Sequence, residues 1–123
     1  MDSFPELPGF DVDGAVQRLA GNMNLYKTLL QRFFQGYTNT GQELEAQIKA
    51  GSWEEAQRNA HTIKGLAGTL GHQGLAEASA ALEAVCRGAA EGSAPAAVPP
   101  AELASFQEQL GKVLAALSQG FGW

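Results

Sequence analysis

Hydrophobic residues recur at spacings of three and four along most of this chain, which is the pattern of amphipathic helices. After an irregular arm over residues 1–10, Asp11 is a good N-cap for a short helix ending near Gly21. A continuous stripe then predicts one long helix over residues 23–50. Glycines inside it, each costing about 1 kcal/mol against alanine in a helix interior, allow a bend. The stripe consists of Tyr26, Leu30, Phe33, Tyr37, Leu44 and Ile48.

Two further helices follow with a short connection between them. Ser52 and Glu55 have the spacing of a capping box, which predicts that a helix begins at the next residue after the serine. This helix spans residues 53–70 and ends where Gly71 can adopt a left-handed conformation. The following stripe predicts a helix over about residues 73–88.

The last part of the chain contains a loop and one more helix. Residues 88–100 consist of small residues and prolines without periodicity and predict a flexible loop. Pro100 suits the first turn of a last helix, which Gly120 ends. No segment alternates with period two, so strands are not expected. We therefore predict an all-α fold, an antiparallel up-down four-helix bundle with an extra short N-terminal helix, as a single domain over residues 1–123.

Composition and charge exclude several classes of function. The 123 residues include 8 Lys and Arg against 13 Asp and Glu, giving a net charge of −5, and the basic residues are scattered. We therefore expect no nucleic-acid partner. No apolar run approaches the roughly 18 residues that span a bilayer, and the acidic, proline-broken N-terminus lacks the regions of a signal peptide. The single cysteine, Cys86, excludes an internal disulfide and fits the cytoplasm, and we interpret it as a small buried residue.

The helix over residues 53–70 carries an unusual outer face. His61 projects about 140° away from the apolar stripe, so we expect it to face solvent. Lys64, Gly65 and Gly68 share that face at spacings of three, four and seven residues. A glycine destabilises a helix and packs nothing, so two beside one histidine need a reason. The physical reason is room, because another molecule's backbone or a phosphoryl group can then approach the imidazole closely. The lysine would add a positive charge beside it.

Two simpler interpretations compete with this one. From the residues alone, a surface histidine with unrelated neighbours explains the face equally well. A metal site shared with His72 does not, because eleven helical positions separate the two histidines by some 16 Å and Gly71 breaks the helix between them. We predict no metal and interpret His72 as a turn or cap residue.

The sequence around His61, AHTIKGLAGTLG over residues 60–71, resembles the signature of histidine phosphotransfer (HPt) domains of two-component phosphorelays. The resemblance extends over about residues 7–88. It includes Asp11-Val12-Asp13, the stretches 25–33 and 75–83, and Gly51-Ser52-Trp53.

The resemblance implies that His61 is the phospho-acceptor, that Lys64 helps to hold the phosphoryl group and that Gly65 leaves space beside it. The same role of leaving space is assigned to Gly68 from helix geometry and not from the resemblance. The chain shows no nucleotide-binding loop and no carboxylate cluster suited to Mg²⁺, so it is not a self-sufficient kinase and has no cofactor of its own. By resemblance, its partners are response-regulator receiver domains, which supply a phospho-aspartate and Mg²⁺, and a hybrid sensor histidine kinase. Nε2 is the expected reacting atom.

Docking residues are less well defined by the sequence. Arg58 would supply charge beside His61, and Gln57 lies on the same outer face. Phe34 is a third candidate at the edge of its own stripe, although packing in the core is the favoured interpretation for it. A monomer is the default for a bundle whose stripes are all used internally. The alternative function is a helical adaptor or inhibitor that binds receiver or kinase domains without being phosphorylated.

Overall fold

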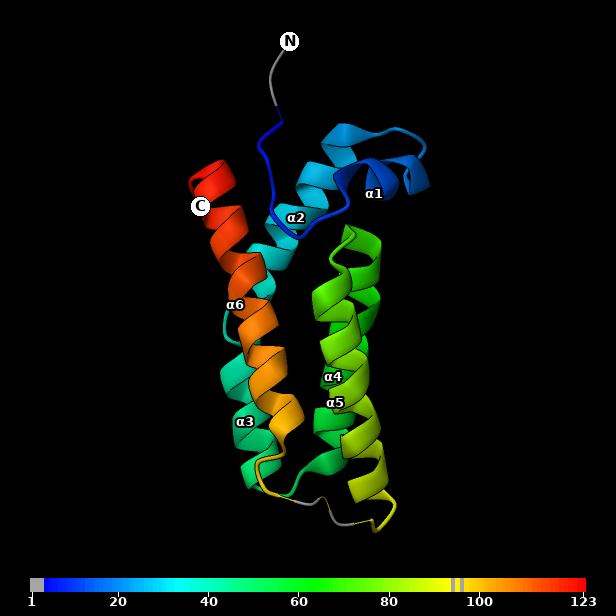
Figure 1. Cartoon of the computed structure of the whole chain (residues 1–123), viewed down its shortest axis with the longest axis vertical. Coiled ribbons are helices and arrows are strands. Elements are labelled where there is room, and N and C mark those ends of the chain that lie inside the picture. The colour runs from blue at the N-terminus through cyan, green and yellow to red at the C-terminus, as the bar shows by residue number, and fades with distance from the viewer. Residues whose placement is uncertain (1–3, 94, 96) are drawn as a thin grey trace.

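The computed structural model describes residues 4–93, 95 and 97–123 and shows an all-α fold (Figure 1). Within these residues there is no strand, and one isolated bridge joins Phe10 to His72. The predicted fold class is confirmed. The helices are α1 (Val12–Arg18), α2 (Met23–Tyr37), α3 (Thr40–Lys49), α4 (Trp53–Leu70), α5 (Gln73–Ala90) and α6 (Ala101–Phe121).

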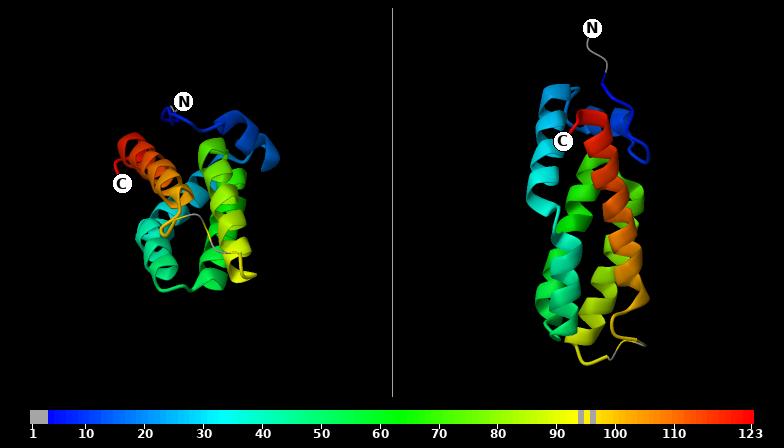
Figure 2. Two further views of the ribbon diagram at one scale, coloured as in Figure 1. Left: turned by 60° about the horizontal axis from the view of Figure 1, so that its bottom comes forward. Right: turned by 90° about the vertical axis from the view of Figure 1, so that its left-hand side faces the viewer.

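The body of the bundle consists of α3, α4, α5 and α6, which run up and down beside one another (Figures 1 and 2). α4 and α5 form an antiparallel hairpin, α6 packs against α5, and α3 packs against both α4 and α6. α2 continues beyond α3 toward the end of the molecule where α1 contacts both α2 and α4. In the part of the chain that the structure describes, no helix has the length and apolarity needed to cross a bilayer.

The single long helix expected over residues 23–50 is wrong, because the structure divides it into α2 and α3. α2 ends at Tyr37 and α3 begins at Thr40, whose side chain is buried. The break brings the start of α3 close to α6, where the Gln107 side-chain amide donates to the Gly41 carbonyl at 3.1 Å. A Cβ at Gly41 would lie 3.3 Å from Cγ of Gln107, so the glycine permits this approach.

The helix ends follow the predicted signals at two positions and depart from them at a third. The Asp11 carboxylate accepts the Gly14 N–H, and Gly71 ends α4 with a φ of 85°. The predicted capping box is wrong, because the Ser52 side chain makes no capping hydrogen bond. Its backbone N–H instead donates to the Gln47 carbonyl at 2.8 Å, closing the end of α3.

The remaining boundaries shift by a few residues. The first helix ends at Arg18 rather than near Gly21, because the chain turns through left-handed residues there. α5 continues to Ala90, so the first residues of the predicted flexible loop over 88–100 are helical, and residues 94 and 96 lie outside the described residues. α6 passes through Gly120 and ends at Phe121, and the C-cap residue Gly122 has a φ of 75°.

The core is a continuous apolar cluster to which all six helices and the N-terminal arm contribute. Cys86 is fully buried within it as predicted, and burial raises the pKa of its thiol to about 11. Tyr26 is also fully buried, and its hydroxyl donates to the Leu70 carbonyl at 2.7 Å. This contact fixes α2 against the end of α4. Trp53, the first residue of α4, packs against the cluster while partly exposed.

Candidate functional site

His61 lies in the middle of α4 on the face opposite the core. Ala60 and Ile63 on either side of it are completely buried, whereas the His61 side chain is 66% exposed. The prediction that this imidazole faces solvent is confirmed. The helix register is therefore fixed by the apolar residues, which leave the histidine on the outside.

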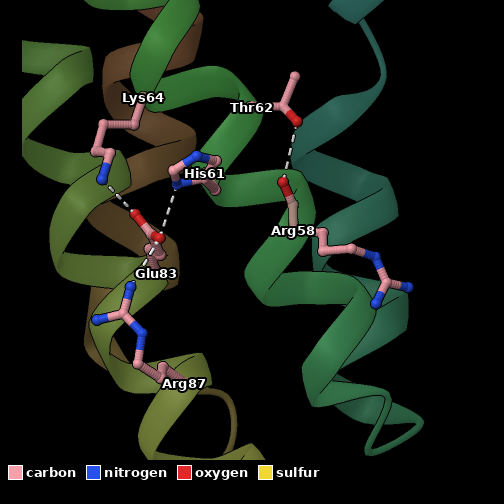
Figure 3. A network of polar contacts seen from close by, with 6 residues as sticks. All are labelled: Arg58, His61, Thr62, Lys64, Glu83 and Arg87. Atoms are coloured by element: carbon pink, nitrogen blue, oxygen red, sulfur yellow. Dashed lines mark hydrogen bonds and ion pairs between the residues drawn. The ribbon is translucent and has the colours of Figure 1, made fainter.

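Glu83 of α5 is the residue that organises the site, and its side chain is only 5% exposed (Figure 3). Its Oε2 lies 2.9 Å from Nδ1 of His61, and its Oε1 lies 2.7 Å from Nζ of Lys64. Nη2 of Arg87, one turn further along α5, donates to Oε2 at 2.9 Å. One buried carboxylate thus binds two cations and the imidazole. We call these four residues the Glu83 cluster.

The α4–α5 hairpin explains why these side chains meet. The connection between the two helices is centred near His72, and His61 and Glu83 lie equally far from it in sequence. In an antiparallel hairpin such positions face each other. Lys64, three residues after His61, shares its face and reaches the same carboxylate. The sequence predictions missed Glu83 and Arg87, although this equal spacing from the turn could have identified the glutamate.

The electrostatics of the cluster keep Glu83 ionised. The hydrogen bond from Lys64 is the largest cause that lowers the pKa of Glu83, desolvation opposes it, and the His61 hydrogen bond lowers it further. An ionised carboxylate can only accept hydrogen bonds, so Nδ1 of His61 carries a proton and donates it. In the neutral imidazole, Nε2 then has a free lone pair. This tautomer is assigned from the hydrogen bond.

The space beside His61 is open. Figure 3 shows the imidazole edge that carries Nε2 turned away from Glu83. Apart from its chain neighbours and the backbone of its own helix, a Cβ placed on Gly65 or Gly68 would meet no atom within 4 Å, so this strip of α4 has room for a larger group. Nη2 of Arg18 in α1 donates to the Gly68 carbonyl at 3.0 Å, which places a further cation at the end of the strip.

The predicted docking residues are distributed around the site. Arg58 is exposed, and its guanidinium extends away from Glu83 (Figure 3). Gln57 is half-buried. Phe34 is also half-buried and packs against the core and the Trp123 ring, with 5.8 Å between ring centroids. Nothing in these contacts tests docking, so the three assignments stay predictions.

His72, the second histidine, has a structural role. It is buried at the N-terminus of α5, where its Nδ1 accepts the Leu75 N–H at 3.0 Å. Its interpretation as a cap residue is confirmed. Among the described residues, no three His, Cys, Asp or Glu side chains gather in a way that could hold a metal ion.

A comparison with protein families agrees with this arrangement. The family model of the Hpt domain matches residues 28–120, which are 93 of the 123 residues. The chain belongs to the Hpt domain family. No curated protein and no solved structure matches it. The matched part of this Hpt domain begins within α2 and extends through most of α6, whereas the resemblance seen in the sequence covered residues 7–88.

Membership of the family gives the Hpt domain its general function. Hpt domains carry out histidine phosphotransfer in phosphorelays and interact with receiver domains. The whole Glu83 cluster lies within the matched residues.

Proposed function

We propose that this Hpt domain accepts a phosphoryl group on Nε2 of His61 from the phospho-aspartate of one receiver domain and passes it to another. The observation that carries the proposal is the contact between Nδ1 of His61 and the buried Glu83 carboxylate. This contact holds the ring in one orientation with Nε2 outward and unprotonated. Exposure of the histidine alone would not favour one nitrogen over the other.

The transfer needs no proton to leave the Hpt domain. The Nε2 lone pair attacks phosphorus as the bond from phosphorus to the aspartate oxygen breaks, and the aspartate leaves as a carboxylate with the bonding electrons. Nδ1 keeps its proton, so the phosphorylated ring carries a positive charge. Glu83, 2.9 Å from Nδ1, stabilises that charge as it develops. The same steps in reverse deliver the group to the second receiver.

The residues on the outer face of α4 support the phosphoryl group. The ammonium group of Lys64, which contacts the same carboxylate as His61, would compensate the charge of the phosphoryl oxygens once it turns toward them. Gly65 and Gly68 leave the room in which the donor can approach in line. Gln57 and Arg58 would contact the rim of the docked receiver, where charge increases the rate of association.

The Mg²⁺ in this reaction would be bound by the receiver domain. Glu83 is the carboxylate at the site, and its two oxygens already accept from three nitrogen donors. Mg²⁺ requires several oxygen ligands in octahedral geometry, which these residues do not offer. A hybrid sensor histidine kinase would supply the phosphoryl group to the first receiver, with the Hpt domain acting as a monomer.

The test uses a panel of receiver domains carrying ³²P on their aspartate. The Hpt domain should take label from at least one receiver, and His61→Gln should take none while binding that receiver with unchanged affinity. His72→Asn is the matched control: it removes the other histidine, and asparagine can still cap α5, so its labelling should equal that of the wild type. Binding without labelling of the wild type would refute the proposal and favour the adaptor function.

A further inference from the structure

If His61 is the phospho-acceptor, the Glu83 carboxylate and the phosphoryl group both require the positive charge of Lys64. The role inferred for the neighbours of Lys64 in transfer therefore rests on that proposed function. In the unphosphorylated structure its ammonium group lies 2.7 Å from Oε1 of Glu83. A phosphoryl group on Nε2 brings about two negative charges to the same face of α4, one turn away. One ammonium group cannot neutralise the carboxylate and the phosphoryl oxygens equally well.

Movement of Lys64 toward the phosphoryl group would leave Glu83 short of a cation. The carboxylate is 5% exposed, so water cannot replace the lost partner easily. The Lys64 side chain itself is 38% exposed on a flexible stem and can change partners without a backbone shift. The free-energy cost of this movement therefore comes from the unneutralised Glu83 carboxylate rather than from the lysine.

Arg87 is placed to lower that cost, because it can neutralise Glu83 when Lys64 moves away. Its guanidinium binds Oε2, the oxygen that Lys64 does not use, from a position four residues after Glu83 on α5. Figure 3 shows it approaching the carboxylate from the side opposite Lys64 and His61.

We propose that Arg87 is a positioning residue for phosphotransfer, which keeps Glu83 neutralised while Lys64 moves from the carboxylate to the phosphoryl group. Arg87 acts through Lys64, and this distinguishes it from a residue that only stabilises the fold. Removing Arg87 should slow phosphorylation because Lys64 then stays with Glu83. Once Lys64 is absent, removing Arg87 as well should have little further effect. The two substitutions are therefore expected to be strongly non-additive.

A small phosphodonor tests this proposal without any receiver. Phosphoramidate breaks its P–N bond as phosphorus bonds to Nε2, and the nitrogen leaves as ammonia. The rate of phosphohistidine formation is followed by ³¹P NMR for the wild type, Arg87→Gln, Lys64→Gln and the double variant. We expect each single variant to be slower by about fivefold, and the double variant to be within about twofold of Lys64→Gln.

Two further variants separate the role of Arg87 from loss of charge or of stability. Arg87→Lys should recover most of the rate, because Lys49 reaches Glu45 at 2.9 Å across the same four-residue spacing. Lys112→Gln removes one positive charge from another exposed pair of this spacing, with Glu108, and should react at the wild-type rate.

The outcomes distinguish this proposal from the proposed function. If the wild type forms no phosphohistidine on His61 from phosphoramidate or from any receiver, the proposed function fails and the role of Arg87 fails with it. If the wild type reacts and Arg87→Gln reacts equally fast, the role of Arg87 alone is overturned. Additive losses in the double variant would also overturn it.

Discussion

Replacing Glu83 by glutamine is expected to weaken both the fold and the transfer reaction. The substitution keeps the shape and one carbonyl acceptor but removes the negative charge that faces Lys64, Arg87 and the imidazole. Hydrogen bonds to charged groups contribute about 1.5–3 kcal/mol each. The three donors are 38%, 50% and 66% exposed and can turn to water, and the amide retains part of the bonding. We therefore expect a loss of about 1–2 kcal/mol at pH 7.

The pH dependence of this loss identifies its cause. The pKa of Glu83 is lowered from its ordinary value of 4.5 in the folded protein, so its stabilising effect is complete above pH 4.5 and is lost as the pH falls through the folded pKa. The difference in unfolding free energy between the wild type and Glu83→Gln should shrink over that range. For a domain of this size, the change at pH 7 corresponds to a Tm lower by about 4–8 °C.

Urea denaturation followed by circular dichroism, at pH values from 7 down to 3, measures this difference directly. Glu108→Gln is the control, because its exposed partner Lys112 lies 3.6 Å away and the pair should contribute nothing measurable. An equal destabilisation by Glu83→Gln at pH 3 and pH 7 would refute the reasoning, since shape rather than charge would then be responsible. So would a variant as stable as the wild type at pH 7.

Three other substitutions have definite expected outcomes. Burial lowers the pKa of His72 below 6.5, so His72 destabilises the fold as the pH falls below 6.5. Thermal denaturation of His72→Asn should therefore show a weaker dependence of stability on pH in that range than the wild type. An unchanged pH dependence would contradict this. Gly65→Leu should be at least as stable as the wild type, because the added side chain meets open space and favours helix, yet should take label from a receiver more slowly; wild-type labelling would show that the space has no role. Tyr26→Phe should lose about 1–2 kcal/mol in urea denaturation, because the buried Leu70 carbonyl loses its donor; no loss would mean that this carbonyl finds another donor.

Local sequence features predicted most of the helices. Asp11 and Gly71 act at helix ends through their own side chain or backbone, so their roles can be recognised without knowledge of the rest of the fold. The division of residues 23–50 could not be recognised in this way. The apolar spacing continues across the break, and the approach of Gly41 to Gln107 in α6 is a contact 66 residues apart in sequence.

The candidate site was also predictable only where its residues belong to one helix. His61 and Lys64 are on one helix three residues apart, so the helical period alone places them together. Glu83 belongs to another helix, and its burial breaks the rule that hydrophobic residues define the inner stripe. Val85, an apolar residue three positions after Leu82, is only half-buried, so apolar spacing alone does not identify the residues that α5 buries. The equal sequence distance of His61 and Glu83 from the turn between α4 and α5 is the signal that would have identified Glu83.

The nitrogen of the His61 imidazole that becomes phosphorylated tests most directly whether Glu83 orients the ring for transfer. Long-range ¹H–¹⁵N correlation spectra of ¹⁵N-labelled protein report the protonation and bonding of both ring nitrogens, before and after reaction with phosphoramidate. We predict that His61 carries its proton on Nδ1 before the reaction and phosphorus on Nε2 afterwards. Phosphorus on Nδ1, or on His72 instead of His61, would contradict the central role assigned to the contact with Glu83.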